Sequence, residues 1–348
     1  MIQVVIADDS AFLRQVLTDI LQKTGKIKVV AAATNGKEAL ELIAKHKPDL
    51  AIFDVEMPVM SGLEALRKVM KDSPLPVLMF SSLTGEGAAV TIKALEYGAA
   101  DFLLKPSSLS GNLSSVADEI VEKVQMIVMR SRLARLSKNK GTPVVKKSVS
   151  LKDLPARKGF QIIAMGSSTG GVQAALEVLK NLPETIPPMV WVQHMPATFT
   201  AKLAERFDSI CKINVREAKD GDVLEQGTCL LGPGGVQMRV KQEGSKFVVR
   251  LGEKDKVTGF CPSCDVLFES VALLGKESVG IILTGMGHDG KEGLIKMKKI
   301  NAYVLGQDEA TSVVYGMPRA AFEAGAVDCQ LGIEQIGQAL MHVCSTNR

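Results

Sequence analysis

Three residues that together can activate an alcohol follow separate apolar stretches in the second half of the sequence. They are Ser168, His194 and Asp289, each placed just after a stretch typical of a buried strand. The chemistry requires these types, because the imidazole takes the serine proton while the carboxylate holds the imidazole in its reactive tautomer. Backbone amides must also stabilise the oxyanion that forms, and those of Thr169 and Met286 are our candidates. The sequence therefore predicts nucleophilic catalysis by a serine.

The glycine-rich run around Ser168, residues 166–171, has other interpretations. A glycine turn can simply join two elements or cradle a phosphate, so a nucleotide-binding enzyme remains an alternative. A dinucleotide-binding loop is disfavoured, because the next strand ends in Gln193-His194 instead of an acidic residue, and no Walker lysine follows Gly171. The run also matches the α/β-hydrolase nucleophile motif in its letters, but that fold orders its residues Ser, Asp, His. We therefore expect a different architecture.

The sequence contains four histidines, so the catalytic imidazole has to be chosen among them. His46 and His342 lie in helical patterns far from the glycine-rich loops, and we expect no catalytic role for them. His288 is adjacent to Asp289, but neighbours on a tight loop rarely point at one spot. We therefore favour His194 as the base.

A second set of chemically active residues lies at the ends of four predicted strands near the N-terminus. The set comprises Asp8, Asp9, Asp54, Ser81 and Lys105. The carboxyl ends of parallel strands meet at one edge of a sheet, so three carboxylates would lie together there and need a compensating charge. Mg²⁺ supplies that charge and prefers carboxylate oxygen. One carboxylate can then accept a phosphoryl group while Lys105 and Ser81 hold its oxygens. Each residue alone could be a helix cap or a surface charge, but the set favours a phosphoryl site.

Strands and helices alternate along the whole chain, as in α/β proteins. In the first part each predicted strand precedes a helical pattern, which predicts a five-stranded, parallel, doubly wound, flavodoxin-like sheet; its strands cover residues 2–7, 28–33, 50–53, 76–80 and 101–104. The second part predicts another doubly wound and mostly parallel domain, with residues 223–251 as an antiparallel hairpin insertion. Its strands cover residues 160–165, 189–193, 279–284 and 302–305.

The length of 348 residues suggests two domains, and a shift in charge marks the boundary between them. Residues 130–158 contain ten Lys and Arg against the single acid Asp153, in a chain of net charge +4. A protein whose second part binds nucleic acid through this basic run is the rival interpretation. However, the run has no aromatic residue, and no helix-turn-helix pattern follows it. We therefore predict a first domain at 1–128, a solvated basic linker at 129–158 and a second domain at 159–348, with no nucleic acid as partner.

Cysteine usage and hydropathy suggest a reduced, cytoplasmic protein. All six cysteines follow residue 210, and the patterns around them can build a core without crosslinks. The N-terminus lacks the basic flank of a secretion signal, and no apolar run reaches the roughly 20 residues that cross a bilayer. We expect no membrane insertion. Cys261 and Cys264 form a lone Cys-x-x-Cys, for which metal or redox chemistry is disfavoured because no second ligand pair accompanies it.

Residues 1 to about 125 resemble the receiver domain of two-component response regulators. The matching residues are Asp8-Asp9, Asp54 with Met57-Pro58 and Gly62, Ser81, and Lys105-Pro106. The resemblance implies that Asp54 accepts a phosphoryl group from a histidine kinase, with Mg²⁺ held by the three acids, and that Ser81 and Lys105 act in the switch.

Residues 160–343 resemble the catalytic domain of the chemotaxis protein-glutamate methylesterases, the CheB family. The resemblance rests on residues 166–171, Gln193-His194-Met195-Pro196, residues 232–235, Pro262-Ser263, residues 265–268 and residues 284–290. It implies hydrolysis of glutamate methyl esters and deamidation of certain glutamines on membrane chemoreceptors, for chemotactic adaptation, with no cofactor for the ester reaction. It also implies control by phosphorylation. Cys261, Cys264 and His288 depart from the usual pattern of the family.

Overall fold

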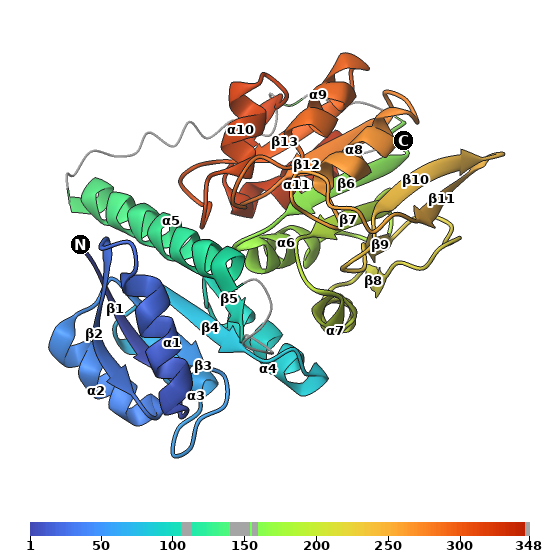
Figure 1. Ribbon diagram of the computed structural model, residues 1–348. Helices are drawn as coiled ribbons and strands as arrows, with labels where there is room; N and C mark the ends of the chain where they lie inside the picture. Colours follow the sequence, from blue (N-terminus) through green and yellow to red (C-terminus); the bar gives the residue numbers. More distant parts are fainter. Residues whose placement is uncertain (106–112, 140–153, 155–158, 345–348) are drawn as a thin grey trace. The chain divides into compact units, whose positions relative to one another are not determined.

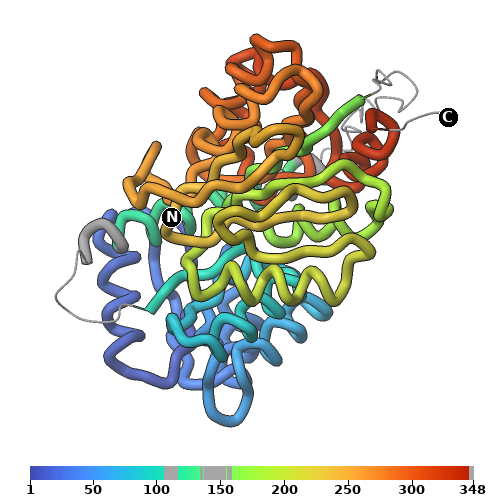
Figure 2. Tube along the Cα trace, turned by 90° about the vertical axis from the view of Figure 1, so that its right-hand side faces the viewer, coloured from blue at the N-terminus to red at the C-terminus, as the bar shows by residue number. Residues whose placement is uncertain are grey.

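The computed structural model describes residues 1–105, 113–139, 154 and 159–344. The chain divides into two compact units, Met1–Val144 and Val145–Arg348. The trace in Figure 2 shows that the chain completes the first unit before it enters the second. We describe each unit by itself.

The first unit is a parallel five-stranded sheet with helices between its strands, as predicted (Figure 1). The strand order is β2-β1-β3-β4-β5, and the strands are β1 (Ile2–Ala7), β2 (Ile27–Ala33), β3 (Leu50–Asp54), β4 (Val77–Ser81) and β5 (Asp101–Leu104). Strands β3 and β4 are buried along their whole length, which a parallel sheet covered on both faces requires. The helices are α1 (Ala11–Gln22), α2 (Gly36–His46), α3 (Gly62–Asp72), α4 (Gly85–Glu96) and α5 (Leu113–Asn139).

The first four helices of this unit begin at local side-chain caps. In each, the residue before the first helical position accepts a hydrogen bond from an amide of the first turn; these residues are Ser10, Asn35, Ser61 and Thr84. Ser61 and Glu64 form a reciprocal capping box at the start of α3. These helix starts were therefore encoded by neighbouring residues.

Helix α5 extends into the segment that we predicted to be linker. It continues to Asn139, because residues 129–139 contain good helix formers and neither glycine nor proline. Arg132 ties this extension to its own unit with a bidentate contact to Asp49, at 3.0 Å from Nε to Oδ1 and 2.7 Å from Nη2 to Oδ2. Most of the remaining predicted linker, like Pro106 of the receiver motif, lies outside the described residues.

The second unit has a seven-stranded sheet of order β14-β13-β12-β6-β7-β9-β8 in which all neighbours are parallel. Its strands are β6 (Ile162–Ser167), β7 (Met189–Gln193), β8 (Asn214–Glu217), β9 (Thr228–Leu231), β12 (Ser278–Ile282), β13 (Tyr303–Gln307) and β14 (Cys329–Leu331). The helices are α6 (Gly171–Leu179), α7 (Ala197–Asp208), α8 (Cys264–Ala272), α9 (Lys291–Lys299), α10 (Met317–Glu323) and α11 (Ile333–Val343). Figure 1 shows α6 and α7 on the opposite side of this sheet from α8 and α9.

The antiparallel insertion is smaller than predicted. Among the strands of the described residues, only β10 (Met238–Glu243) and β11 (Lys246–Leu251) pair in the antiparallel sense, and Val223 adds an isolated antiparallel bridge to Val248. Strand β9 instead joins the main sheet parallel to β7. All four residues of β9 are buried, so it lacks the alternation of a half-exposed hairpin strand. The short strands β8 and β14 were not predicted either, because three or four residues give too little periodicity.

Within the described part of the chain, no helix combines the length and the hydropathy that a bilayer span needs. All six cysteines are free thiols. The prediction of a core built without crosslinks is therefore consistent with the structure.

Candidate active site

Three neighbouring strands of the second unit bring the predicted triad residues to one edge of the sheet. Strand β6 lies between β12 and β7, and Ser168, His194 and Asp289 follow β6, β7 and β12. Backbone hydrogen bonds hold the strand ends together, from His194 N to Ser167 O at 3.1 Å and from Ser168 N to Thr284 O at 3.0 Å. We call this edge, with Ser168, His194 and Asp289, the hydrolytic edge.

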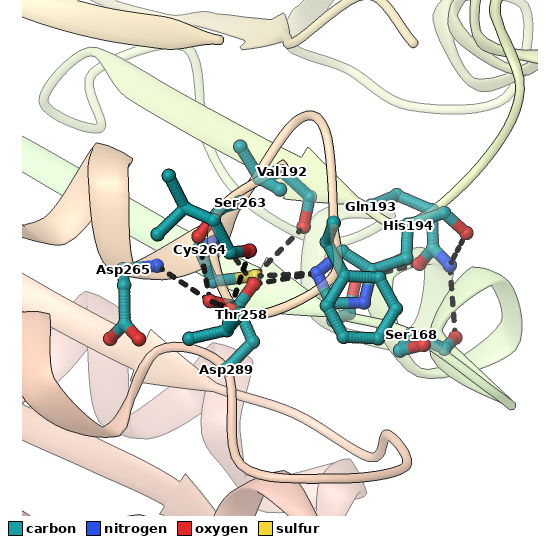
Figure 3. A network of polar contacts seen from close by, with 12 residues as sticks. Ser168, Val192, Gln193, His194, Thr258, Ser263, Cys264, Asp265 and Asp289 are labelled. Carbon is teal, nitrogen blue, oxygen red and sulfur yellow. Dashed lines mark hydrogen bonds and ion pairs between the residues drawn. The ribbon is translucent and has the colours of Figure 1, made fainter. Parts of the chain in front are cut away.

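His194 and Asp289 form a buried pair at this edge (Figure 3). The imidazole Nε2 lies 2.7 Å from Asp289 Oδ2, and the two side chains are 6% and 0% exposed. Because an ionised carboxylate only accepts hydrogen bonds, this contact assigns the proton of the neutral ring to Nε2. The other nitrogen, Nδ1, is buried and has no hydrogen-bond partner among the described residues. A proton acceptor is therefore left free on the buried ring.

Ser168 lies near this ring without donating to it. In the view of Figure 3 the His194 ring lies between Asp289 and Ser168. Since Nδ1 has no partner, the Ser168 hydroxyl makes no hydrogen bond to it in this structure. Catalytic hydrogen bonds are often open in unliganded enzymes and tighten when substrate binds. The start of the Asp289 loop is close, because a Cβ on Gly285 would meet the Ser168 Cβ at 2.8 Å.

Asp289 is surrounded by hydrogen-bond donors from three segments. Besides His194, its oxygens contact the hydroxyls of Thr258 and Ser263 at 2.7 Å each, and the backbone amides of Cys264 at 2.6 Å and Asp265 at 3.2 Å. Burial would raise the pKa of Asp289, but the hydrogen bond from His194, the positive charge of that ring when it is protonated, and the two hydroxyls outweigh burial and lower the pKa. The carboxylate is therefore held in its charged form.

The two amides that bind Asp289 are the first two of helix α8, whose own residues provide no side-chain cap. The positive end of the α8 dipole thus faces the carboxylate and stabilises its charge. In return, Asp265 of α8 accepts a hydrogen bond of 2.8 Å from the amide of Gly293 in the first turn of α9. Burial, with the nearby charge of Asp289, raises the pKa of Asp265 despite that hydrogen bond. Asp289 therefore caps α8, the helix that contains Asp265, and Asp265 caps α9, the helix that follows Asp289.

The two backbone donors predicted for the oxyanion lie on the loops that flank Ser168. Thr169 is buried in the turn that leads into α6, where Gly170 adopts φ +75° and a Cβ would come within 2.5 Å of Val313. Only glycine fits there without strain. Met286 is half-buried on the loop before Asp289, and its backbone N–H has no hydrogen-bond partner among the described residues. An amide available to a ligand is therefore present at one of the two positions.

The sequence did not indicate that Phe260 and Cys264 enclose the imidazole: Phe260 was not a candidate, and Cys264 was considered only as part of a Cys-x-x-Cys. Phe260 stacks on the His194 ring with centroids 3.7 Å apart and an angle of 8°. The buried thiol of Cys264 lies 3.7 Å from His194 Nε2, and burial raises its pKa well above the usual value, which keeps it protonated and unreactive. Cys261 has different surroundings, with a weak contact to Glu253 O. His288, the rival imidazole, is exposed while Asp289 is buried.

The predicted phosphoryl residues meet at the carboxyl ends of the strands in the first unit. Lys105 Nζ lies 2.7 Å from Asp54 Oδ1 and 3.2 Å from Asp8 Oδ2, and oxygens of Asp8, Asp9 and Asp54 lie within 4.8 Å of one another. We call these four residues the receiver edge. Burial raises the pKa of Asp54 to about 6, against the lowering effect of Lys105, and the Asp8 charge adds to the rise.

The donor set at the receiver edge suits a hard divalent cation. Asp8 Oδ2 is buried and accepts no hydrogen bond, although Lys105 is within ion-pair distance. Three carboxylates with an orphaned oxygen are the ligands that Mg²⁺ prefers. Ser81, at the end of β4, is buried; its hydroxyl accepts from Thr91 Oγ1 at 2.8 Å and contacts Ser82 O at 3.2 Å. No motif in the sequence pointed to Thr91.

Comparisons with known proteins match both units. A family model described as CheB methylesterase matches residues 163–340, and one described as response regulator receiver domain matches residues 4–116. The protein-glutamate methylesterase/protein-glutamine glutaminase of Pyrococcus abyssi is 43% identical over 98% of this chain and 93% of its own length. The protein of that name numbered 1 in Caulobacter vibrioides is 44% identical over 100% of this chain and 99% of its own. The crystal structure of the Thermotoga maritima CheB methylesterase catalytic domain matches with a TM-score of 0.52 and 35% identity, covering 53% of this chain and 98% of that one.

Proposed function

The chain belongs to the CheB methylesterase family and also contains a response regulator receiver domain, and we propose that it is a protein-glutamate methylesterase and protein-glutamine glutaminase controlled by phosphorylation. Residues 1–128 form the receiver and residues 159–348 the hydrolytic domain, and the family matches at 4–116 and 163–340 support this division. The substrates are methylated glutamates, and certain glutamines, of membrane chemoreceptors, and the process is chemotactic adaptation. The protein acts in the cytoplasm.

Ester hydrolysis begins with attack of Ser168 Oγ on the ester carbonyl carbon. His194 accepts the serine proton at Nδ1, because Nε2 already donates to Asp289, and the imidazolium so formed is stabilised by the buried carboxylate. The backbone amides of Thr169 and Met286 stabilise the oxyanion. As the bond between the carbonyl carbon and the methoxy oxygen breaks, the proton on His194 passes to that oxygen and methanol leaves. The glutamyl group is then esterified to the serine.

Water completes the cycle by the reverse proton route. His194 takes a proton from water, the hydroxide attacks the acyl carbon, and the proton returns to Ser168 as the glutamate carboxylate is released. A glutamine side chain undergoes the same attack, except that its amide nitrogen accepts the His194 proton and leaves as ammonia. One set of residues thus performs both reactions without a cofactor.

The receiver edge accepts the control signal. Asp8, Asp9 and Asp54 would hold Mg²⁺, which would supply the positive charge that phosphoryl transfer to a carboxylate needs. Asp54 accepts the phosphoryl group from a histidine kinase, and Lys105, which already contacts Asp54, holds a phosphoryl oxygen. Ser81 contributes its hydroxyl after turning from its present partners. Phosphorylation raises the hydrolytic rate of the other domain.

The observation that carries the hydrolytic mechanism is the free, buried Nδ1 of an imidazole whose Nε2 is fixed by Asp289. The test measures methanol release from methylated chemoreceptor membranes by the full chain, with and without a small phosphodonor and Mg²⁺. We expect Ser168→Ala to abolish turnover and Asp54→Asn to abolish the increase that the phosphodonor produces. Substantial methanol release by Ser168→Ala would mean that another group is the nucleophile.

A further inference from the structure

A buried side-chain amide connects the segments that carry the nucleophile and the base. Gln193 Nε2 donates to the carbonyl of Ser168 at 2.9 Å and to that of His194 at 3.4 Å. Gln193 is only 3% exposed, so water does not compete with its side-chain amide for hydrogen bonds to these two carbonyls. Figure 3 shows the amide beside the Ser168 and His194 backbones.

The orientation of this amide is fixed by a chain of hydrogen bonds behind it. Trp191 Nε1 lies 2.8 Å from Ser167 Oγ, and Ser167 Oγ lies 2.7 Å from Gln193 Oε1. An indole N–H can only donate, so the hydroxyl accepts from Trp191 and donates its one proton to Gln193 Oε1. The oxygen of the amide must therefore face Ser167, and its NH₂ group must face the two carbonyls.

Tight packing holds the three hydrogen-bonded side chains in this arrangement. Trp191 and Ser167 are completely buried, and the indole stacks on Phe207 with centroids 5.4 Å apart. Gly171 lies so close that a Cβ there would meet Gln193 Oε1 at 2.3 Å. Side chains that are locked in this way hold a site within the small tolerance that catalysis requires.

We propose that Gln193, oriented through Ser167 by Trp191, is a positioning residue that sets the Ser168 hydroxyl relative to His194 Nδ1. The proposal rests on the hydrolytic function proposed above. Gln193 itself touches no reacting atom. Its NH₂ group fixes the backbone on both sides of the gap that the serine proton must cross, so its loss reduces the fraction of complexes in attack geometry while substrate binding stays unchanged.

The test replaces each member of the chain in the full-length protein and measures kcat and KM for methanol release. In Gln193→Glu a carboxylate oxygen replaces the NH₂ group and repels both carbonyls, and we expect kcat to fall about 100-fold with KM unchanged. Ser167→Ala frees the amide to turn and should lower kcat less. Trp191→Phe keeps the aromatic stacking on Phe207 and should have the smallest effect of the three.

The Gln193→Glu variant also has a pH signature that loss of packing would not produce. When the new carboxyl group is protonated it can donate to the Ser168 carbonyl again, so the ratio of its kcat to that of the parent protein should rise as the pH is lowered. A ratio independent of pH, with kcat and KM changed together, would overturn the proposal.

Ser270→Ala is the matched control. Ser270 is a buried serine of the same unit whose hydroxyl also has two partners, Val240 N and Leu267 O, away from the hydrolytic edge. It should lower the melting temperature about as much as Ser167→Ala but leave kcat unchanged. A fall in kcat matching that of Ser167→Ala would overturn the positioning role.

A fluorophosphonate that labels the active serine separates this proposal from the proposed function. If the parent protein is labelled, Ser168→Ala is not, and Gln193→Glu is labelled about 100-fold more slowly, both proposals stand. Labelling of Gln193→Glu at the parent rate would refute the positioning role alone. Labelling that persists in Ser168→Ala would refute the proposed nucleophile.

Discussion

The receiver edge and the hydrolytic edge both lie at the carboxyl ends of parallel strands and both contain a buried acid. The pKa values of the two acids, Asp54 and Asp289, are nevertheless shifted in opposite directions. Burial raises the pKa of Asp54 to about 6. Asp289 is also deeply buried, but its pKa lies below the usual value because the donors around it outweigh desolvation. Position in the sheet therefore does not decide the protonation of a carboxylate.

The difference comes from the number and kind of donors. Asp54 receives one protein hydrogen bond from a backbone amide, at 3.3 Å from Glu56, besides its ion pair with Lys105, and has the Asp8 charge beside it. Asp289 receives an imidazole, two hydroxyls and the two amides at the start of α8. An acid with few donors is suited to bind a cation and accept a phosphoryl group. An acid saturated with donors is suited to remain charged and orient a base.

Replacing Asp54 should have the strongest consequence, and it distinguishes the two edges. Asp54→Asn should abolish phosphoryl uptake, because the amide is a poor nucleophile, and radioactive phosphoryl transfer from a phosphodonor measures it. Asp289→Asn should be phosphorylated like the parent protein. Loss of phosphorylation in both variants would show that the edges are not chemically independent.

A second substitution weakens the hydrolytic edge alone. Asp289→Asn should lower kcat for methanol release by about 10⁴-fold, since an amide no longer stabilises the imidazolium or fixes its tautomer. It also removes charge from the cap of α8, so hydrogen exchange of the Cys264 and Asp265 amides should accelerate. Unchanged exchange with a reduced kcat would separate the catalytic role from the capping role.

The free energy of unfolding of the second unit should depend on pH through Asp265. The pKa of Asp265 is raised in the folded state, so the folded protein keeps a proton that the unfolded chain releases near pH 4. This group's contribution therefore lowers the free energy of unfolding as pH rises from about 4 through the raised folded value. Asp265→Asn cannot titrate, so its second unit should lose less stability over that window. Trp191, the single tryptophan, reports urea unfolding of this unit.

The weakest consequences are expected for substitutions at the starts of two helices. Ser61 caps α3 within its own segment, so Ser61→Ala should destabilise the first unit by about 1 kcal/mol and speed exchange of the Glu64 amide. Ser263 has the same place before α8 but donates to Asp289 instead of capping. Ser263→Ala should therefore reduce kcat while exchange in α8 stays unchanged. The reverse pattern would contradict the assignment of the two caps.

Much of the fold was predictable because local patterns of apolar residues indicate it. The five strands of the first unit and the principal strands of the second were found from apolar runs, which parallel sheets require. The edge strands β8 and β14 were missed because they are short, and β9 was assigned to the wrong sheet because pairing partners are not written in a strand's own sequence. The basic composition of residues 130–139 suggested a linker, although its helix formers were equally visible.

The site could be predicted only in part. The sequence placed Ser168, His194 and Asp289 after strands of one sheet, and the structure brings these three segments to one edge. Residues such as Phe260 and Thr258 were invisible, because they reach the site from a loop whose path depends on tertiary packing. The catalytic roles of Ser168, His194 and Asp289 remain predictions that the experiments above test.

The order of residues along the chain was enough to establish the residue types available for chemistry, the strand that precedes each of them and the local caps of the first unit's helices. Which proton acceptor is free and which acid is charged became clear from the three-dimensional fold. Those properties depend on burial and on donors supplied by distant segments, as when the amides of α8 meet Asp289. Hydrogen bonding and desolvation act over a few ångströms in space, whatever the separation along the chain.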